Sequence, residues 1–253
     1  GPLAFRFSFW MRVLTFVLGG VAAGIVSERI RKLLVEALQN LRERERIKAL
    51  FGQHVSPRVM EHLLARAHEN HSELRHVCIL VLDLRNFTRF AERRSPDEVV
   101  AELNRLWGHM VRAVNENHGF VNKFLGDGFL AVFGAPLSSG NDAQNAVNAA
   151  QRILRELDDF KAAGLAPALE IGIAVHAGEA IVGNVGSAER KEYTVIGDVV
   201  NVAFRLEALN KEMGSRLLIS EKVRQAIGLV AGKSAASRRV RGREAAVAVH
   251  ALA

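Results

Sequence analysis

Two aspartates stand where carboxylates could bind a metal ion. Asp83 ends the apolar run VCILVL, and Asp127 lies between two glycines in the segment GDG. Carboxylates at the ends of neighbouring strands can converge on one edge of a sheet and hold hard cations such as Mg²⁺ beside phosphates. Each aspartate alone also has a simpler explanation, because Asp127 suits a tight turn and Asp83 can satisfy local backbone groups.

Other polar residues recur at spacings that suit a shared site. Lys123 precedes Asp127 by four residues, and Asn201 and Arg205 are four residues apart on a predicted helix, so they share one face. Taken singly, Lys123 could be a solvated strand lysine, Asn201 a turn cap and Arg205 a surface helix residue. The spacing therefore becomes informative only when the motifs are taken together.

Three longer motifs occur in order and at the spacing of one domain: VLDLRNFT, VNKFLGDGFLAVF and EYTVIGDVVNVAFRL. Together they resemble the catalytic domain of the class III nucleotidyl cyclases. The segment FGQHVSPRVMEHLL also looks like the helical lead-in that precedes many bacterial members. The resemblance covers residues 51–250. It implies an α+β fold of the ferredoxin-like type, with a mixed, largely antiparallel sheet.

The resemblance assigns the metal ligands. Asp83 and Asp127 match the two metal-binding aspartates of the family, and the carbonyl of Leu84 is a further expected ligand. The implied cofactors are two Mg²⁺ or Mn²⁺ ions per site. The implied reaction is the conversion of ATP to 3′,5′-cyclic AMP and pyrophosphate.

The resemblance also assigns residues that select the base. Lys123 matches the base-reading lysine, and Thr194 matches its partner position. Adenine presents an acceptor at its ring nitrogen and a donor at its exocyclic amine, which a lysine ammonium and a threonine hydroxyl can pair. Guanine presents the reverse pattern, so a lysine would meet its ring N–H donor to donor. The residues at these two positions therefore favour ATP.

The remaining expected site residues contact ribose and phosphate. Asn201 and Arg205 match the pair that acts in the transition state. Arg241 stands where the family uses a lysine for the triphosphate, and arginine binds phosphate with a different geometry. The backbone at Phe87 and Thr88 is expected to cradle phosphate. Asn86 replaces the glycine that the family commonly has there, and asparagine tolerates such turns.

In the family that the sequence resembles, the base-reading and transition-state residues of one protomer complete the metal site of the other. This chain carries both groups of residues, so the resemblance implies a homodimer with two composite sites. Three other functions fit parts of the sequence. A diguanylate cyclase has acidic and aromatic residues directly after the glycine pair of its hairpin, an order that GDGF lacks. A module that binds ATP without turnover is supported only by Asn86 and Arg241. A nucleic-acid binder would draw on the basic residues near Arg241, but lacks interleaved aromatics, and no nucleic-acid partner is expected.

The elements that must position these residues alternate along the chain. The apolar periodicity predicts strands at residues 76–84, 169–176, 192–196 and 216–220, a hairpin at 120–133, and helices at 96–117, 142–163 and 199–209. A short helix and a last strand pair between residues 239 and 252 follow, after a small-residue loop at 231–237. The motif GDG supplies the hairpin turn. Strands separated by helices indicate a layered catalytic domain over residues 76–253.

The first 75 residues are expected to form three segments that precede the catalytic domain. Residues 9–26 are apolar apart from Arg12 and are followed by basic residues, which predicts the end of a transmembrane region over residues 1–26. An amphipathic helix is the alternative. Residues 27–50 place Ile30, Leu34, Ala37 and Leu41 on a short coiled-coil seam, which suits a transducing stalk or a plain dimerisation helix. Residues 51–75 form the lead-in.

The composition limits the setting more than the function. The net charge of +7 fits an anionic membrane surface, a nucleic acid or a polyphosphate substrate. The single cysteine, Cys78, lies in an apolar run and cannot form an intramolecular disulfide, which favours a reducing compartment. Charge alone does not choose among these partners. The apolar segment at residues 9–26 and its basic flank predict attachment to the cell membrane, with the catalytic domain on the cytoplasmic side.

Overall fold

The computed structural model describes residues 72–164, 169–187, 189–229, 235–239 and 246–253, together with positions 20, 24, 27–32, 34–35, 38–39 and 59–60. The chain divides into two compact units, residues 1–55 and 56–253. In the first unit the described residues are helical, and Ile30 and Leu34 of the predicted seam are exposed. Ala37 and Leu41 lie outside the described residues, as do most of residues 1–26 and of the lead-in 51–75. No helix within the described part is long and apolar enough to cross a membrane.

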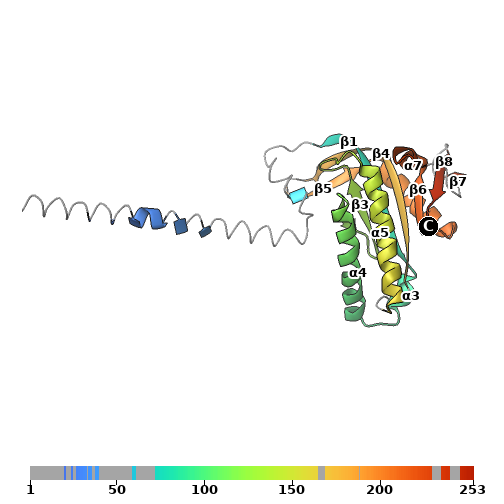
Figure 1. Cartoon of the computed structure of the whole chain (residues 1–253), viewed down its shortest axis with the longest axis horizontal. Coiled ribbons are helices and arrows are strands. Elements are labelled where there is room, and N and C mark those ends of the chain that lie inside the picture. The colour runs from blue at the N-terminus through green and yellow to red at the C-terminus, as the bar shows by residue number, and fades with distance from the viewer. Residues whose placement is uncertain are drawn as a thin grey trace, which may run out of the picture. The chain divides into compact units, whose positions relative to one another are not determined.

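The second unit is an eight-stranded sheet with helices on both faces (Figure 1). Its elements are β1 (Glu73–Arg85), α3 (Phe87–Ala91), α4 (Pro96–Glu116), β2 (Phe120–Phe124), β3 (Gly128–Phe133), α5 (Asp142–Ala162), β4 (Glu170–Gly186), β5 (Lys191–Ile196), α6 (Asp198–Glu212), β6 (Leu217–Ser220), α7 (Glu221–Ala226), β7 (Ala235–Arg239) and β8 (Ala246–Ala251).

The sheet order confirms the predicted α+β, ferredoxin-like class. The strands run β2-β3-β1-β4-β6-β8-β7, and β5 pairs with β4 beside this path. The pairs are antiparallel except for β4 with β6. The first four strands and the helices α4 and α5 form the β-α-β-β-α-β unit typical of ferredoxin-like folds. This unit brings β1, with Asp83 at its end, to the centre of the sheet.

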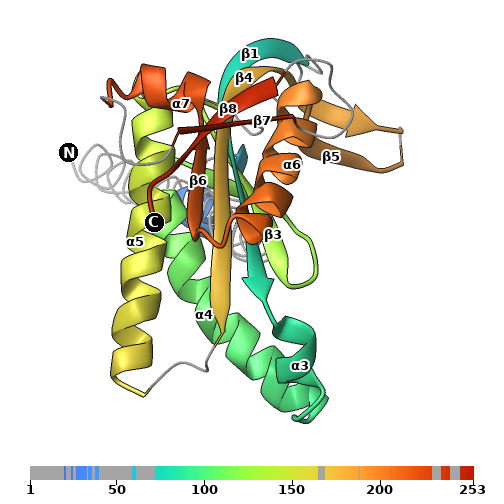
Figure 2. The ribbon, with the colours of Figure 1, turned by 90° about the vertical axis from the view of Figure 1, so that its right-hand side faces the viewer.

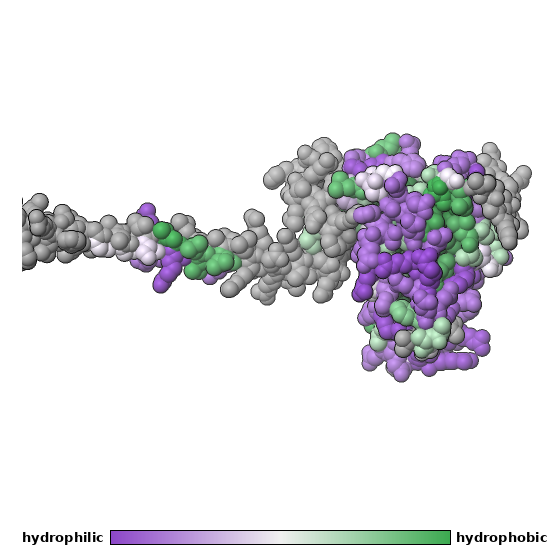
Figure 3. All heavy atoms as spheres, in the orientation of Figure 1, coloured by the Kyte–Doolittle hydropathy of each residue, from purple (hydrophilic) through white to green (hydrophobic). Residues whose placement is uncertain are grey.

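The two faces of the sheet carry two separate cores. Along β4, Ile173 and Val175 belong to the core with α4 and α5, whereas Ala174 packs with α6 on the other face. Successive side chains of a strand point to opposite faces, which explains this division. Figure 2 shows α4 and α5 on one side of the strands and α6 on the other. The outward surface of α4 and α5 is mainly hydrophilic (Figure 3), as expected for amphipathic helices.

Local sequence signals explain the ends of the long helices. Ser95 and Glu98 form the predicted capping box at the start of α4, in which the Ser95 hydroxyl accepts from the Glu98 backbone N–H and the Glu98 carboxylate accepts from the Ser95 N–H. Gly164, with a φ of 68°, follows the end of α5 as predicted. The buried side of α5, which consists of alanines and leucines with Val147 and Ile153, packs against the sheet. Both helices share one hydrophobic core with β1 and β3.

Two predicted boundaries were wrong. The strand predicted at residues 169–176 continues to Gly186, because it forms a hairpin with β5. The last strand pair begins at Ala235 and not near Arg239, so that the predicted small-residue loop at 231–237 overlaps β7. β7 pairs with β8 from Ala235 to Arg239, so backbone pairing overrides the weak strand propensity of alanine and serine. Cys78 is buried in β1 and free, as expected.

Candidate active site

Asp83 and Asp127 lie on adjacent segments of the sheet. Asp83 pairs with Gly128 in the register of β1 and β3, and the backbone N–H of Leu84 donates to the carbonyl oxygen of Asp127 at 3.0 Å. Asp127 stands in the tight connection between β2 and β3, where Gly126 has a φ of 75°. The hairpin turn therefore places the second carboxylate beside the end of β1, as the sequence predicts.

The electrostatics of this edge favour a bound cation. Partial burial and the charge of Asp127 raise the pKa of Asp83, and Lys211 and Arg85 act in the opposite direction. Two carboxylates that repel each other become more favourable with a cation between them, and their oxygens suit Mg²⁺ or Mn²⁺. Within the described residues there is no cluster of three or more His, Cys, Asp or Glu side chains arranged as a metal site. The two aspartates would therefore need other ligands, such as the Leu84 carbonyl, water or substrate phosphate.

Arg85 of β1 and Glu207 of α6 form a charged cluster near Asp83 that the sequence did not indicate. Gly172 lies directly opposite Asp83 in the β1–β4 pair. A side-chain carbon on Gly172 would lie 2.9 Å from Nη2 of Arg85 and 3.0 Å from Oε1 of Glu207, so these two groups fill the space that glycine leaves. Nη2 of Arg85 also donates to the carbonyl of Ser215 at 2.6 Å.

Glu207 carries the most perturbed carboxyl of this cluster. Burial and the charge of Asp83 raise the pKa of Glu207 to about 7, with a smaller contribution from Asp127, while Arg85 and Lys211 partly oppose the shift. Its position directly after the third motif, two residues beyond Arg205, was the only available signal. A helical face is visible in sequence, but the strand that it meets is not.

Lys123 and Thr194 are brought to one place by a β-bulge in β2. The register of β2 against β3 shifts between Val121 and Lys123, so Asn122 is the extra residue. The neighbours Asn122 and Lys123 consequently both reach β5. Lys123 Nζ lies 3.8 Å from Oε1 of Glu192, and both side chains are largely exposed. The segments of β2 and β5 that carry the predicted base-reading pair are therefore in contact.

Asn122 connects the two strands by hydrogen bonds. Its Nδ2 donates to the carbonyl oxygen of Tyr193 at 2.8 Å, and the hydroxyl of Thr194 donates to its Oδ1 at 3.3 Å. Thr194 is buried, with 8% of its surface exposed. Sequence reasoning did not identify Asn122, although the low strand propensity of asparagine is a weak signal that the strand is irregular there.

Asn201 and Arg205 lie on α6 and share a face, as predicted. Val202, Ala203 and Leu206 are the buried side of this helix, Asn201 is exposed and Arg205 is partly buried. Arg205 and Glu207 are two residues apart, which is about 200° around a helix. The face of α6 that carries Glu207 and Lys211 acts on the pKa of Asp83. The face with Asn201 and Arg205 consequently points in another direction.

The loop after Asp83 has the geometry that its motif requires. Asn86 has a φ of 61° and lies in the left-handed region, where the family commonly has glycine. Phe87 packs against the core beside Phe90, with ring centroids 6.1 Å apart, and Thr88 is exposed at the start of α3. Arg241 lies outside the described residues.

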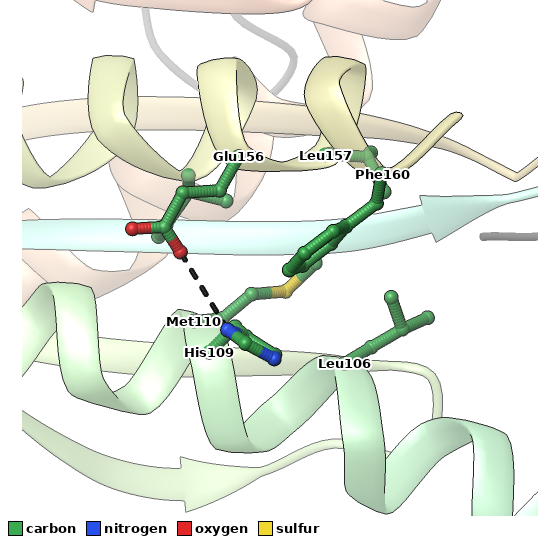
Figure 4. Close-up of a pocket in the computed structure, with 7 residues that line it drawn as sticks. Leu106, His109, Met110, Glu156, Leu157 and Phe160 are labelled. Carbon is green, nitrogen blue, oxygen red and sulfur yellow. Dashed lines mark ion pairs between the residues drawn. The ribbon is translucent and has the colours of Figure 1, made fainter. Parts of the chain in front are cut away.

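A shallow pocket on the α4–α5 side of the sheet contains none of the predicted site residues. Its walls are mainly apolar side chains, and His109 Nδ1 lies 4.0 Å from Oε2 of Glu156 at its edge (Figure 4). The ring of Phe160 stands edge-on to His109, with centroids 4.6 Å apart. The packing of two amphipathic helices accounts for these contacts, so we assign the chemistry to the edge with Asp83 and Asp127.

Comparison with known proteins gives one consistent result. The family model for the adenylate and guanylate cyclase catalytic domain matches residues 69–248. The uncharacterized protein Rv1320c of Mycobacterium tuberculosis is 42% identical over 185 residues, which are 73% of this chain and 32% of that protein. The chain thus spans about a third of the length of this curated relative.

Solved structures agree with the family model. The guanylyl cyclase Cya2 is 33% identical, with a TM-score of 0.61 over 70% of this chain and 91% of that one. The adenylyl cyclase CyaB from P. aeruginosa is 26% identical, with a TM-score of 0.63 over 71% of this chain and 94% of that one. A guanylyl cyclase and an adenylyl cyclase therefore both share this fold.

Proposed function

Because the chain belongs to the adenylate and guanylate cyclase catalytic domain family, we propose that it converts ATP to 3′,5′-cyclic AMP and pyrophosphate. The observation that carries this proposal is the adjacency of Asp83 and Asp127, joined through the backbone hydrogen bond from Leu84. It creates an anionic edge suited to divalent cations and a polyphosphate. ATP as the substrate is supported by Lys123 and Thr194.

Ring closure needs the ribose 3′-oxygen to attack the α-phosphorus while pyrophosphate leaves. We assign Asp83 and Asp127, with the Leu84 carbonyl, to the binding of two Mg²⁺ or Mn²⁺ ions. When bound, such ions lower the pKa of the attacking hydroxyl and neutralise charge on the phosphates. Asn201 would orient the ribose, and Arg205 would stabilise negative charge that develops on the α-phosphate. The protein thereby contributes alignment and electrostatic stabilisation.

The triphosphate needs further positive charge and backbone donors. We propose that Arg241 contacts the triphosphate and that the turn at Phe87 and Thr88 lies against a phosphate. The left-handed conformation of Asn86 turns the chain sharply between Asp83 and α3. Consecutive backbone N–H groups in such turns form concave sites for anions. This arrangement would hold the leaving group next to the two aspartates.

A homodimer would complete each site. The face of α6 with Glu207 and Lys211 acts on Asp83 of the same chain, whereas Asn201 and Arg205 point elsewhere. One chain therefore cannot easily direct Arg205 to its own aspartates. We propose that Arg205 and Asn201 serve the aspartates of a second copy, which gives two equivalent sites. The apolar side chains of Phe124 and Leu125, beside the hairpin turn, are exposed and suit such an interface.

The direct test is product formation from each nucleotide. Purified chain should convert ATP to cyclic AMP with Mg²⁺ or Mn²⁺, and should form cyclic GMP from GTP far more slowly. Guanylyl cyclase activity is the second candidate, because the similar structure Cya2 is a guanylyl cyclase. Preferential turnover of GTP would select that alternative. No turnover of either nucleotide by a dimeric chain would contradict both. Membrane attachment through residues 1–26 is a separate proposal, tested by fractionation of cells that express the chain.

A further inference from the structure

The contacts of Asn122 determine whether the hydroxyl of Thr194 acts as a hydrogen-bond donor or as an acceptor towards a further partner. The carbonyl of Tyr193 is only an acceptor, so the group 2.8 Å from it must be the amide Nδ2 of Asn122. This fixes the orientation of the amide and leaves Oδ1, which is only an acceptor, 3.3 Å from Oγ1 of Thr194. The hydroxyl proton of Thr194 consequently points to Asn122.

A threonine hydroxyl is otherwise ambiguous. It carries one donor and two acceptor lone pairs and rotates to suit its partner. With its proton bonded to Asn122, Thr194 can offer only lone pairs to a third group. An acceptor suits the exocyclic amine of adenine and opposes the carbonyl oxygen of guanine. Because Thr194 is buried, water cannot readily supply a replacement partner for a mismatched base.

We infer that Asn122 is a specificity-determining positioning residue, which makes Thr194 an obligate acceptor and thereby favours adenine over guanine. The bulge in β2 is what allows this, since it turns Asn122 and Lys123 towards β5 together. Lys123 would then supply the fixed donor of the pair and Thr194 the fixed acceptor. This inference rests on the proposed function, because it applies only if Lys123 and Thr194 bind the base.

The test is a double-mutant cycle read as the ratio of kcat/KM for ATP to kcat/KM for GTP. Asn122→Leu keeps the shape of the side chain and removes both hydrogen bonds, which frees the Thr194 hydroxyl to donate to guanine. The ratio should fall by about ten-fold or more. In a chain that already carries Thr194→Val, which has no hydroxyl, Asn122→Leu should leave the ratio unchanged. Thr194→Ser, which keeps a hydroxyl, is the matched control and should retain the preference for ATP.

Each other outcome is decisive. If the ratio is unchanged by Asn122→Leu in an ATP-preferring chain, the inference is wrong and the proposed function stands. If Asn122→Leu lowers the ratio equally in the Thr194→Val chain, Asn122 acts through Lys123 or the backbone, and the inference is again wrong. Asn122→Ala provides the same comparison if circular dichroism shows that Asn122→Leu does not fold. A wild-type chain that prefers GTP or converts neither nucleotide contradicts the proposed function before any variant is made.

Discussion

Gly128 lies opposite Asp83 across the β1–β3 pair, and a methyl group on Gly128 would lie 2.5 Å from the carbonyl oxygen of Leu82. We therefore expect Gly128→Ala to push β3 away from Asp83, to lower the free energy of unfolding by about 1–3 kcal/mol and to abolish turnover. Urea unfolding and an activity assay measure the two effects. Gly108→Ala in α4 is the control, because nothing lies within 4 Å of the added carbon. It should stabilise the chain by about 0.5–1 kcal/mol. Normal activity in Gly128→Ala would contradict the assigned geometry.

A mixture of two inactive variants should recover activity. Asp83→Ala removes a metal ligand, and Asn201→Ala removes a residue that we assign to the site of the other chain, so each homodimer should be nearly inactive. A heterodimer of the two keeps one complete site. An equal mixture should therefore form about a quarter of the wild-type product, given random pairing of the chains.

The control for this mixture combines Asp83→Ala with Asp127→Ala. Both changes affect the metal-binding half of a composite site, so each of the two sites in their heterodimer lacks one aspartate. That mixture should stay inactive. If the first mixture is also inactive although heterodimers are detected by native mass spectrometry, the shared-site proposal is wrong.

Exchanging the base-reading pair should change the preferred nucleotide. Lys123→Glu and Thr194→Cys together reverse the donor and acceptor pattern offered to the purine. Each mismatch leaves a buried polar group unpaired, at about 1–3 kcal/mol, so two mismatches should alter the ATP to GTP preference by orders of magnitude. The assay is kcat/KM for both nucleotides. Lost ATP activity without a gain for GTP would indicate a damaged pocket, but an unchanged preference for ATP would show that the pair does not bind the base.

Glu207 should make stability depend on pH. Burial and Asp83 raise its pKa from 4.5 to about 7, against the opposing charges of Arg85 and Lys211. The folded chain thus binds this proton more tightly than the unfolded chain. The resulting stabilisation is complete below pH 4.5 and is lost as the pH rises to about 7. Glu207→Gln is neutral throughout, so its melting temperature should fall less than that of the wild type over this range.

The melting temperatures are measured by scanning calorimetry without divalent cations, because a bound cation would change the charge near Glu207. Glu92→Gln, at an exposed position after α3, is the matched control and should retain the wild-type dependence. Identical pH dependence in the wild type and Glu207→Gln would mean that Glu207 titrates as an ordinary exposed carboxyl.

The sequence predicted most of the fold because the long elements carry strong local signals. The capping box at Ser95 and the apolar face of α5 set the helices, and the glycines around Asp127 set the hairpin. The end of β4 was missed because Gly178 and Glu179 interrupt its apolar pattern. Backbone pairing with β5 carries the strand on through these residues, and no local signal records a partner that comes later in the chain.

The site was predicted in part for a related reason. The motifs indicated Asp83, Asp127 and Lys123, because each motif is a short run of neighbouring residues. The Arg85–Glu207 cluster over Gly172 joins three elements, and only the sheet register shows that it stands opposite Asp83. Contacts between distant segments depend on packing, which composition and periodicity do not record.

The bulge in β2 also gives neighbouring residues of one strand different roles. Before it, Val121 packs against the core; after it, Phe124 is exposed and its ring lies against Trp107, with centroids 5.7 Å apart. Asn122 and Lys123 lie between these two residues and both face β5. On the proposed function, substitutions at the two middle positions would therefore change the preferred base while the core stays intact. Deleting one of these two residues would instead remove the bulge, and with it either the hydrogen bonds of Asn122 or the ammonium group of Lys123. In an evolving lineage, substrate choice could drift by point substitution at this place, but not by a change in strand length.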